Sequence, residues 1–150
     1  MHAHANLKLW PILALLIGLA GCEYIPFSSG ELQGTAAPIP SSWTEAASPN
    51  VIELETNPAA PYSVKLWIIG EGPNLWVHAG ANRTTWVEHM ETDPRVRVLM
   101  NDALFELRAE RVTTQDEFDE FSDLYESKYG NRPRNENVDE AYLFRLLPRV

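Results

Sequence analysis

Short runs that alternate apolar and polar residues recur through the last hundred positions, and this alternation limits the possible folds more than any other feature of the sequence. Val51–Thr56 alternates aliphatic and acidic residues, and Arg95–Met100 alternates charged and aliphatic ones. Asn101 and Asp102 supply a tight turn before the alternation resumes over residues 103–112. A period of two residues indicates strands that bury one face. We therefore expect an antiparallel sheet in one domain spanning residues 51–150.

Three other segments also have the composition of strands. Residues 62–69 are rich in Val, Trp and Ile, and a second apolar run covers residues 75–79. The turn-forming sequence GEGPN lies between these two runs and predicts that they pair as a hairpin. Residues 141–147 predict a final apolar strand, which brings the expected number of strands to six.

Two segments predict helices. Thr85 and Glu88 have the spacing of a capping box, which opens a short helix that should end near residues 93–94. The same spacing recurs at residues 114 and 117, and the helix after it carries Phe118, Phe121 and Tyr125 on one face. Six strands and two helices fit an α+β fold in which an antiparallel barrel is closed or nearly closed, because closure removes exposed strand edges. An open α+β sandwich is the alternative.

The first 21 residues have the layout of a secretory signal peptide, with Lys8 in a polar start, an apolar stretch over residues 9–19, and small residues after it. The sequence LAGC at residues 19–22 resembles the bacterial lipobox, which implies cleavage before Cys22 and lipidation of its thiol. The lipid would anchor the protein in a membrane of the cell envelope, facing the periplasm, and Glu23 favours the outer membrane. An ordinary signal peptide or an uncleaved anchor helix is the alternative.

Composition restricts the rest of the chain. Residues 22–50 are rich in Pro, Gly, Ser, Ala and Thr, so we expect a flexible linker between the lipidated Cys22 and the domain. The chain has one Cys, so no intramolecular disulfide can form and the domain must be stabilised by its core. A formal net charge of -9 repels phosphate backbones, which argues against a nucleic-acid partner.

The segment LWVHAGANRT at residues 75–84, followed by a short helix and by DPRVRV at residues 93–98, resembles the split β-barrel flavoproteins. This group contains pyridoxamine phosphate oxidase-like and deazaflavin-dependent nitroreductase-like proteins, and the resemblance covers residues 51–148. It implies a six-stranded split β-barrel that binds FMN or a deazaflavin. It also implies an oxidoreductase of the nitroreductase or quinone reductase type, and a homodimer with cofactor sites at the subunit boundary.

The resemblance further implies roles for individual residues. The basic residue that opens the short helix holds the flavin phosphate in the family, and Arg83 occupies that position. A guanidinium is a bidentate phosphate partner, and Thr84 would add a hydroxyl where the family often has a lysine. Lys65 stands where family members often carry an arginine that reaches the cofactor. His78 and Trp76 share one face of their strand, and His78 would lie over the flavin ring or donate a proton.

Each of these residues also has an interpretation without a ligand. Arg83 and Lys65 would be solvated surface residues, and His78 would be a hydrogen-bonded histidine of the barrel. The fold would then be a cofactor-free module that binds a small ligand or a protein partner.

Three tryptophans, Trp67, Trp76 and Trp86, would form either an aromatic wall for a flat ligand or part of the core. His89 has no second histidine at ligand spacing, so we expect no metal site. The sequence contains no recognisable catalytic nucleophile, and the catalytic residues stay unassigned.

Overall fold

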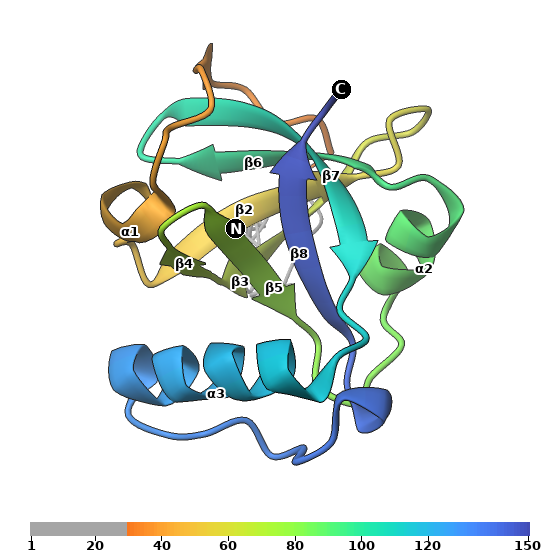
Figure 1. Ribbon diagram of the computed structural model, residues 1–150. Helices are drawn as coiled ribbons and strands as arrows, with labels where there is room; N and C mark the ends of the chain where they lie inside the picture. The colour runs from red at the N-terminus through yellow and green to blue at the C-terminus, as the bar shows by residue number, and fades with distance from the viewer. Residues whose placement is uncertain (1–29) are drawn as a thin grey trace, which may run out of the picture.

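The computed structural model describes residues 30–150, and its strands form one curved sheet (Figure 1). The order across the sheet is β3-β2-β6-β7-β8-β5-β4, and every neighbouring pair is antiparallel. The strands are β2 (Val51–Thr56), β3 (Tyr62–Trp67), β4 (Ile69–Glu71), β5 (Asn74–His78), β6 (Arg95–Met100), β7 (Ala103–Arg111) and β8 (Leu143–Pro148). A further two-residue strand, β1 (Thr35–Ala36), pairs with β7 in parallel. The expected α+β fold on an antiparallel sheet is confirmed.

The sheet curls into a barrel with one open seam. Strands β3 and β4 lie at opposite ends of the strand order, yet only Ile68 separates them in the chain. The two ends of the sheet must therefore lie side by side. No strand pairing joins β3 to β4 or β5 within residues 30–150, so the barrel is split at this place, which we call the seam.

Within residues 30–150, three α-helices and one short 3₁₀ helix accompany the sheet. They are α1 (Trp43–Ala46), α2 (Thr85–Thr92), α3 (Gln115–Tyr129) and η1 (Val138–Glu140). Helices α2 and α3 are the two that the sequence predicts. Gly130 caps the C-terminus of α3, and its φ of 81° is the left-handed conformation that glycine adopts most easily. In Figure 1, α3 runs beneath the barrel at the end where β5 finishes.

The predicted hairpin between residues 62–69 and 75–79 is wrong for most of its length. Strand β3 pairs instead with β2 along six residues, and only Ile69–Glu71 pairs with β5. The run breaks at Ile68, whose backbone N–H donates to the Tyr129 hydroxyl at 3.0 Å while its carbonyl accepts from that hydroxyl at 2.9 Å. A side chain of α3 thus satisfies the backbone groups that a continuous ladder would have paired.

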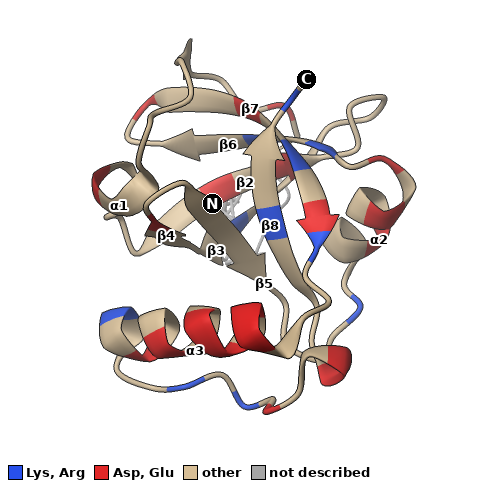
Figure 2. Ribbon diagram, viewed as in Figure 1, with Lys and Arg blue, Asp and Glu red and all other residues tan. Residues whose placement is uncertain are grey.

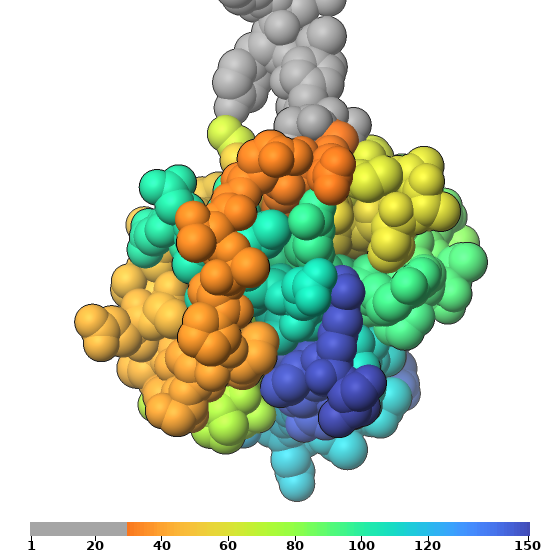
Figure 3. Space-filling model, turned by 90° about the horizontal axis from the view of Figure 1, so that it is seen from above, coloured from red at the N-terminus to blue at the C-terminus, as the bar shows by residue number. Residues whose placement is uncertain are grey.

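The predicted flexible linker is also wrong for residues 30–50, which fold onto the barrel and which we call the arm. Trp43 is 1% exposed, and its ring packs edge-on against Phe105 with centroids 5.1 Å apart. Helix α1 approaches β4 so closely that a Cβ at Gly70 would lie 2.5 Å from the Cβ of Ala47, so only glycine fits there. Figure 3 shows the arm running across the surface of the barrel.

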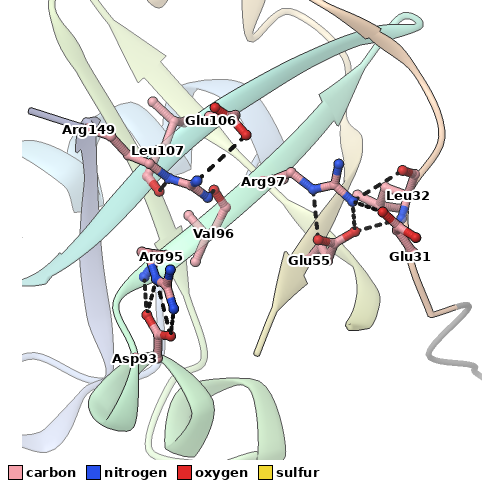
Figure 4. A network of polar contacts seen from close by, with 10 residues as sticks. All are labelled: Glu31, Leu32, Glu55, Asp93, Arg95, Val96, Arg97, Glu106, Leu107 and Arg149. Carbon is pink, nitrogen blue, oxygen red and sulfur yellow. Dashed lines mark hydrogen bonds and ion pairs between the residues drawn. The ribbon is translucent and has the colours of Figure 1, made fainter. Parts of the chain in front are cut away.

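An ion pair fixes the start of the arm to the barrel (Figure 4). The Glu55 carboxylate, 6% exposed, accepts two hydrogen bonds from Arg97 at 2.7 and 2.6 Å and a third from the backbone N–H of Leu32 at 2.6 Å. Nearby, the Ser63 hydroxyl donates to the carbonyl of Gly30 at 2.8 Å. The arm therefore begins at the Ser63 end of β3.

The other end of the arm is held by α3. The Lys128 ammonium donates to the backbone carbonyls of Ala47, Pro49 and Ile68 at 2.7–2.9 Å. Partial burial lowers the pKa of this ammonium. The last turn of α3 thus joins the arm and the seam.

Two apolar clusters stabilise the fold, and β5 separates them. Leu75 and Val77 point into the first, which we call the barrel interior, whereas Trp76 points into the second, which we call the layer beneath α3. Alternation along a strand that is covered on both faces explains why all three are 0% exposed. The layer beneath α3 consists of Ile69, Trp76, Val112, Phe118, Phe121, Val138, Ala141 and Leu143.

The predicted signal peptide and Cys22 lie outside the described residues. Among the helices of residues 30–150, none combines the length and the apolar character that crossing a bilayer requires.

Candidate functional site: a cleft along the seam

Two adjoining hollows lie where the seam meets α3. The first has a volume of about 550 Å³ and is bounded by β3, β5 and α3. The second also measures about 550 Å³ and is bounded by residues 80–82 and by the loop of residues 131–135. Trp67, His78 and Tyr125 line both, so we treat the hollows as one cleft. Their sizes fall in the usual range for small-molecule sites, about 300–1,000 Å³.

Aromatic side chains form one wall of the cleft. Trp67, at the end of β3, is 46% exposed, and it stacks on Tyr129 with ring centroids 4.3 Å apart and planes 12° apart. Tyr125 lies one turn earlier on α3, and its ring centroid is 5.7 Å from that of Trp67. Partial burial raises the pKa of both tyrosine hydroxyls. Tyr129 supports Trp67 from behind, and its hydroxyl is taken up by Ile68 and Asn50. The wall therefore offers the rings of Trp67 and Tyr125 and the neutral Tyr125 hydroxyl.

His78 stands at the end of β5, between the two hollows. Its ring packs against Phe121 at 5.2 Å, with Phe118 and Tyr125 slightly farther away. Burial lowers the pKa of the imidazole to about 4, because no carboxylate offsets the loss of water. Its Nε2 atom is buried and has no hydrogen-bond partner among residues 30–150. At pH 7 His78 is a neutral group suited to hydrogen bonding, and its pKa is too low for an efficient general base at that pH.

Trp76 lies behind the cleft and has no exposed surface. Its indole Nε1 donates to the Glu117 carboxylate at 2.9 Å, and Arg145 donates to both oxygens of the same carboxylate at 3.2 Å. The network joins β5, β8 and α3. The structure thus gives Trp76 a supporting position and no contact with the cleft.

Arg83 and Thr84 do not line the cleft. The Arg83 guanidinium bonds Glu91 at 2.8 and 3.0 Å and Glu88 at 2.7 Å, and these carboxylates of α2 raise its pKa. Thr84 is the N-cap of α2, but its hydroxyl makes no capping bond and is buried with no partner in the described part of the chain. The two residues predicted to hold a phosphate therefore do not form a joint anion site in this structure.

The remaining predicted residues divide between cleft and core. Lys65 is exposed on β3 and lines the first hollow. Of the three tryptophans considered as an aromatic wall, only Trp67 lines the cleft. Trp86 is 5% exposed in the barrel interior, and Trp76 is in the layer beneath α3, so the three do not form one wall.

Sequence reasoning assigned no site role to α3 or to the loop after it. Phe121 and Tyr125 were predicted as part of an apolar stripe, but nothing in the stripe indicates that its last turns face a hollow. The loop contributes Arg132 and Arg134, and Arg132 bonds Asp123 and Glu126. The one available signal was the RPR sequence at residues 132–134, because basic residues in a loop are frequent ligand contacts.

Metal-binding groups do not gather anywhere in residues 30–150: three or more His, Cys, Asp or Glu side chains never lie close enough to share an ion. His89 instead shares a hydrogen bond with the Thr56 hydroxyl at 2.9 Å.

Comparison with known proteins shows the fold. No protein-family model and no curated protein sequence matches the chain. Among solved structures, a candidate pyridoxamine 5'-phosphate oxidase from Listeria innocua matches with a TM-score of 0.55 and 14% identity, covering 71% of this chain and 90% of that one. An FAD-binding protein from Mesorhizobium loti matches with a TM-score of 0.54 and 17% identity, covering 71% and 87%.

A third similar structure is named for heme and not for a flavin. A heme storage protein from Vibrio cholerae matches with a TM-score of 0.53 and 16% identity, covering 67% of this chain and 82% of that one. Likeness at these identities shows a shared split-barrel fold. Because proteins on this scaffold differ in what they bind, function must be argued from the cleft.

Proposed function

We propose that this protein binds a flavin or deazaflavin ring in the cleft and acts as an oxidoreductase of the nitroreductase or quinone reductase type. The cleft is the observation that carries the proposal, because an open hollow lined by Trp67, Tyr125 and Phe121 suits a flat ring. The similarity to split-barrel structures that include an FAD-binding protein supports it. A bound flavin would supply the hydride-transfer chemistry.

The side chains that line the cleft suit the ring of such a cofactor, whereas the residue predicted to hold its phosphate is poorly placed. Trp67 offers ring surface, and the neutral His78 offers a hydrogen bond to a ring heteroatom. Arg83 fits less well, because its guanidinium already bonds Glu88 and Glu91. The protein would bind and orient the ring and limit its exposure to water.

The cellular setting is part of the same proposal. Lipidation of Cys22 would anchor the protein in a membrane of the cell envelope, with the domain facing the periplasm and the outer membrane as the favoured location. Mass spectrometry of the mature N-terminus should find Cys22 as the first residue, carrying acyl chains. A second copy of the chain would complete the dimer that the resemblance implies.

A titration tests the cofactor proposal. Residues 30–150 contain both apolar clusters, so a soluble chain that begins at residue 23 keeps the whole described fold. FMN or a deazaflavin should bind it with quenching of flavin fluorescence. Trp67→Ala should weaken binding about five- to 150-fold, because stacking on an aromatic ring is worth on the order of 1–3 kcal/mol.

Trp67→Phe is the matched control, since it keeps a ring at the same place and should retain most of the affinity. Absence of flavin uptake by the parent protein would refute the cofactor proposal. The second candidate, a cofactor-free module for another small ligand, would then be favoured, and the engagement of Arg83 by two carboxylates is the observation that supports it.

A further inference from the structure

The cations of this protein fall into two groups. The described residues include eleven Lys and Arg side chains, and nine of them bond a carboxylate or a backbone carbonyl. Lys65 and Arg134 are the two without such a contact in this part of the chain. Both line the cleft, Lys65 in the first hollow and Arg134 in the second.

The lining of the cleft contains no acidic residue, although the chain has 21 Asp and Glu. Two other surface hollows do contain them, Glu53 and Asp102 in one and Glu31, Glu55 and Glu106 in the other. Figure 2 shows the contrast next to the cleft, with acidic residues along α3 and basic residues on the loop that follows. In a protein of net charge -9, an acid-free cleft with unpaired cations locally favours an anion.

We infer that the cleft selects a flat aromatic ligand that carries an anionic group, and that Arg134 binds this group. The inference deepens the proposed function and rests on the same cleft. Trp67 and Tyr125 would hold the rings, and Arg134 would meet the anion at the mouth of the second hollow. The side chains of Asn82, Asn131 and Asn135 line this hollow. Asn131 and Asn135 each donate one amide N–H to a backbone carbonyl, and the second N–H of each amide is left for a ligand.

Arg134 fits the role better than the other cations nearby. Arg132 occupies the same loop but bonds Asp123 and Glu126, and Arg83 bonds two carboxylates of α2. An arginine already bonded in this way would have to break those bonds to accept an anion. Lys65 forms no ion pair within the described residues, but Glu53 lies directly opposite it on β2 and reduces its attraction for an anion.

A pair of dyes with the same rings tests this inference. Anilinonaphthalene sulfonate carries a sulfonate, and phenylnaphthylamine has the same ring system without it. Fluorescence titration of the chain that begins at residue 23 should give tighter binding of the sulfonate dye. Arg134→Gln should weaken the sulfonate dye about three- to tenfold, the range expected for one exposed charge contact, and should leave the neutral dye unchanged.

Arg83→Gln is the matched control, because it removes the same unit of charge from a residue outside the cleft. It should change the affinity for neither dye. Equal losses in both variants, or unchanged sulfonate binding in Arg134→Gln, would overturn the inference.

The dyes also separate this inference from the cofactor proposal. An Arg134-dependent preference for the sulfonate in a protein that takes up no flavin would support an anionic aromatic ligand of another kind. Flavin uptake with no preference for the sulfonate would support the cofactor and refute the anion site.

Discussion

The barrel interior and the layer beneath α3 share β5 as a wall, yet they differ in the polar groups they contain. The interior is lined by apolar side chains such as Leu54 and Val77, both 0% exposed. The layer beneath α3 encloses the Trp76–Glu117 hydrogen bond and borders His78 and the Tyr129 hydroxyl. The interior secures the fold, whereas the layer opens at one end into the cleft. A small barrel can thus place its ligand chemistry outside its main core.

Removing Trp43 should have the largest effect and tests whether the interior includes the arm. Trp43→Ala should lower the free energy of unfolding by about 3–5 kcal/mol, because it leaves a large cavity in a closed apolar cluster. Denaturant unfolding measures the change. Ile39→Ala is the control in the same segment, since Ile39 is 37% exposed and should contribute little. Equal stability of the two variants would mean that the arm does not belong to the interior.

The free energy of unfolding should depend on pH through His78, which borders the layer beneath α3. The pKa of His78 is about 4 in the folded protein and about 6.5 when unfolded, so the unfolded chain binds more protons between these values. Stability should be complete above pH 6.5 and should fall as the pH approaches 4, with this residue contributing a loss of up to about 3 kcal/mol.

His78→Leu and His78→Gln should both reduce this dependence, because neither side chain titrates. The measurement is the free energy of unfolding from denaturant titrations at several pH values between 4 and 7. A parent protein and variants with parallel pH profiles would show that His78 stays hydrated in the folded state.

The seam should respond to a smaller change. Tyr129→Phe removes the hydroxyl that bonds the backbone of Ile68 and Asn50, and should cost about 1–2 kcal/mol of unfolding free energy. Tyr125→Phe is the matched control one turn earlier, since the Tyr125 hydroxyl makes no hydrogen bond within residues 30–150. Similar losses in both variants would argue against a special role for Tyr129 in closing the seam.

Sequence reasoning located most strands because apolar and polar residues alternate along them, and in Arg95–Met100 burial follows the same alternation. It missed the break at Ile68, because that break depends on a hydroxyl 61 residues away. It treated the arm as a linker because composition is averaged over many residues, and one buried Trp43 does not alter the average. Contacts between distant segments leave no local pattern to detect.

The candidate site was predictable only in part, for the same reason. His78 and Lys65 line the cleft, and their contact with a cofactor stays a prediction. Arg134 can be singled out only when the partners of the other cations in residues 30–150 are known. The engagement of Arg83 had a local signal, since Glu88 and Glu91 follow on the next turns of α2. When an arginine at the start of a helix is inferred to bind phosphate, acidic residues on the first turns of that helix indicate that the arginine is already paired.

The place where the arm enters the domain bears on how the protein would present its cleft. Gly30 is bonded to Ser63 at the start of β3, and Trp67 lines the cleft at the finish of the same strand, roughly 13 Å farther along. A protein tethered through the residues before Gly30 would hold its cleft on the side remote from the attachment point. If Cys22 is lipidated as proposed, diffusing molecules would enter the cleft without passing between the domain and the lipid surface.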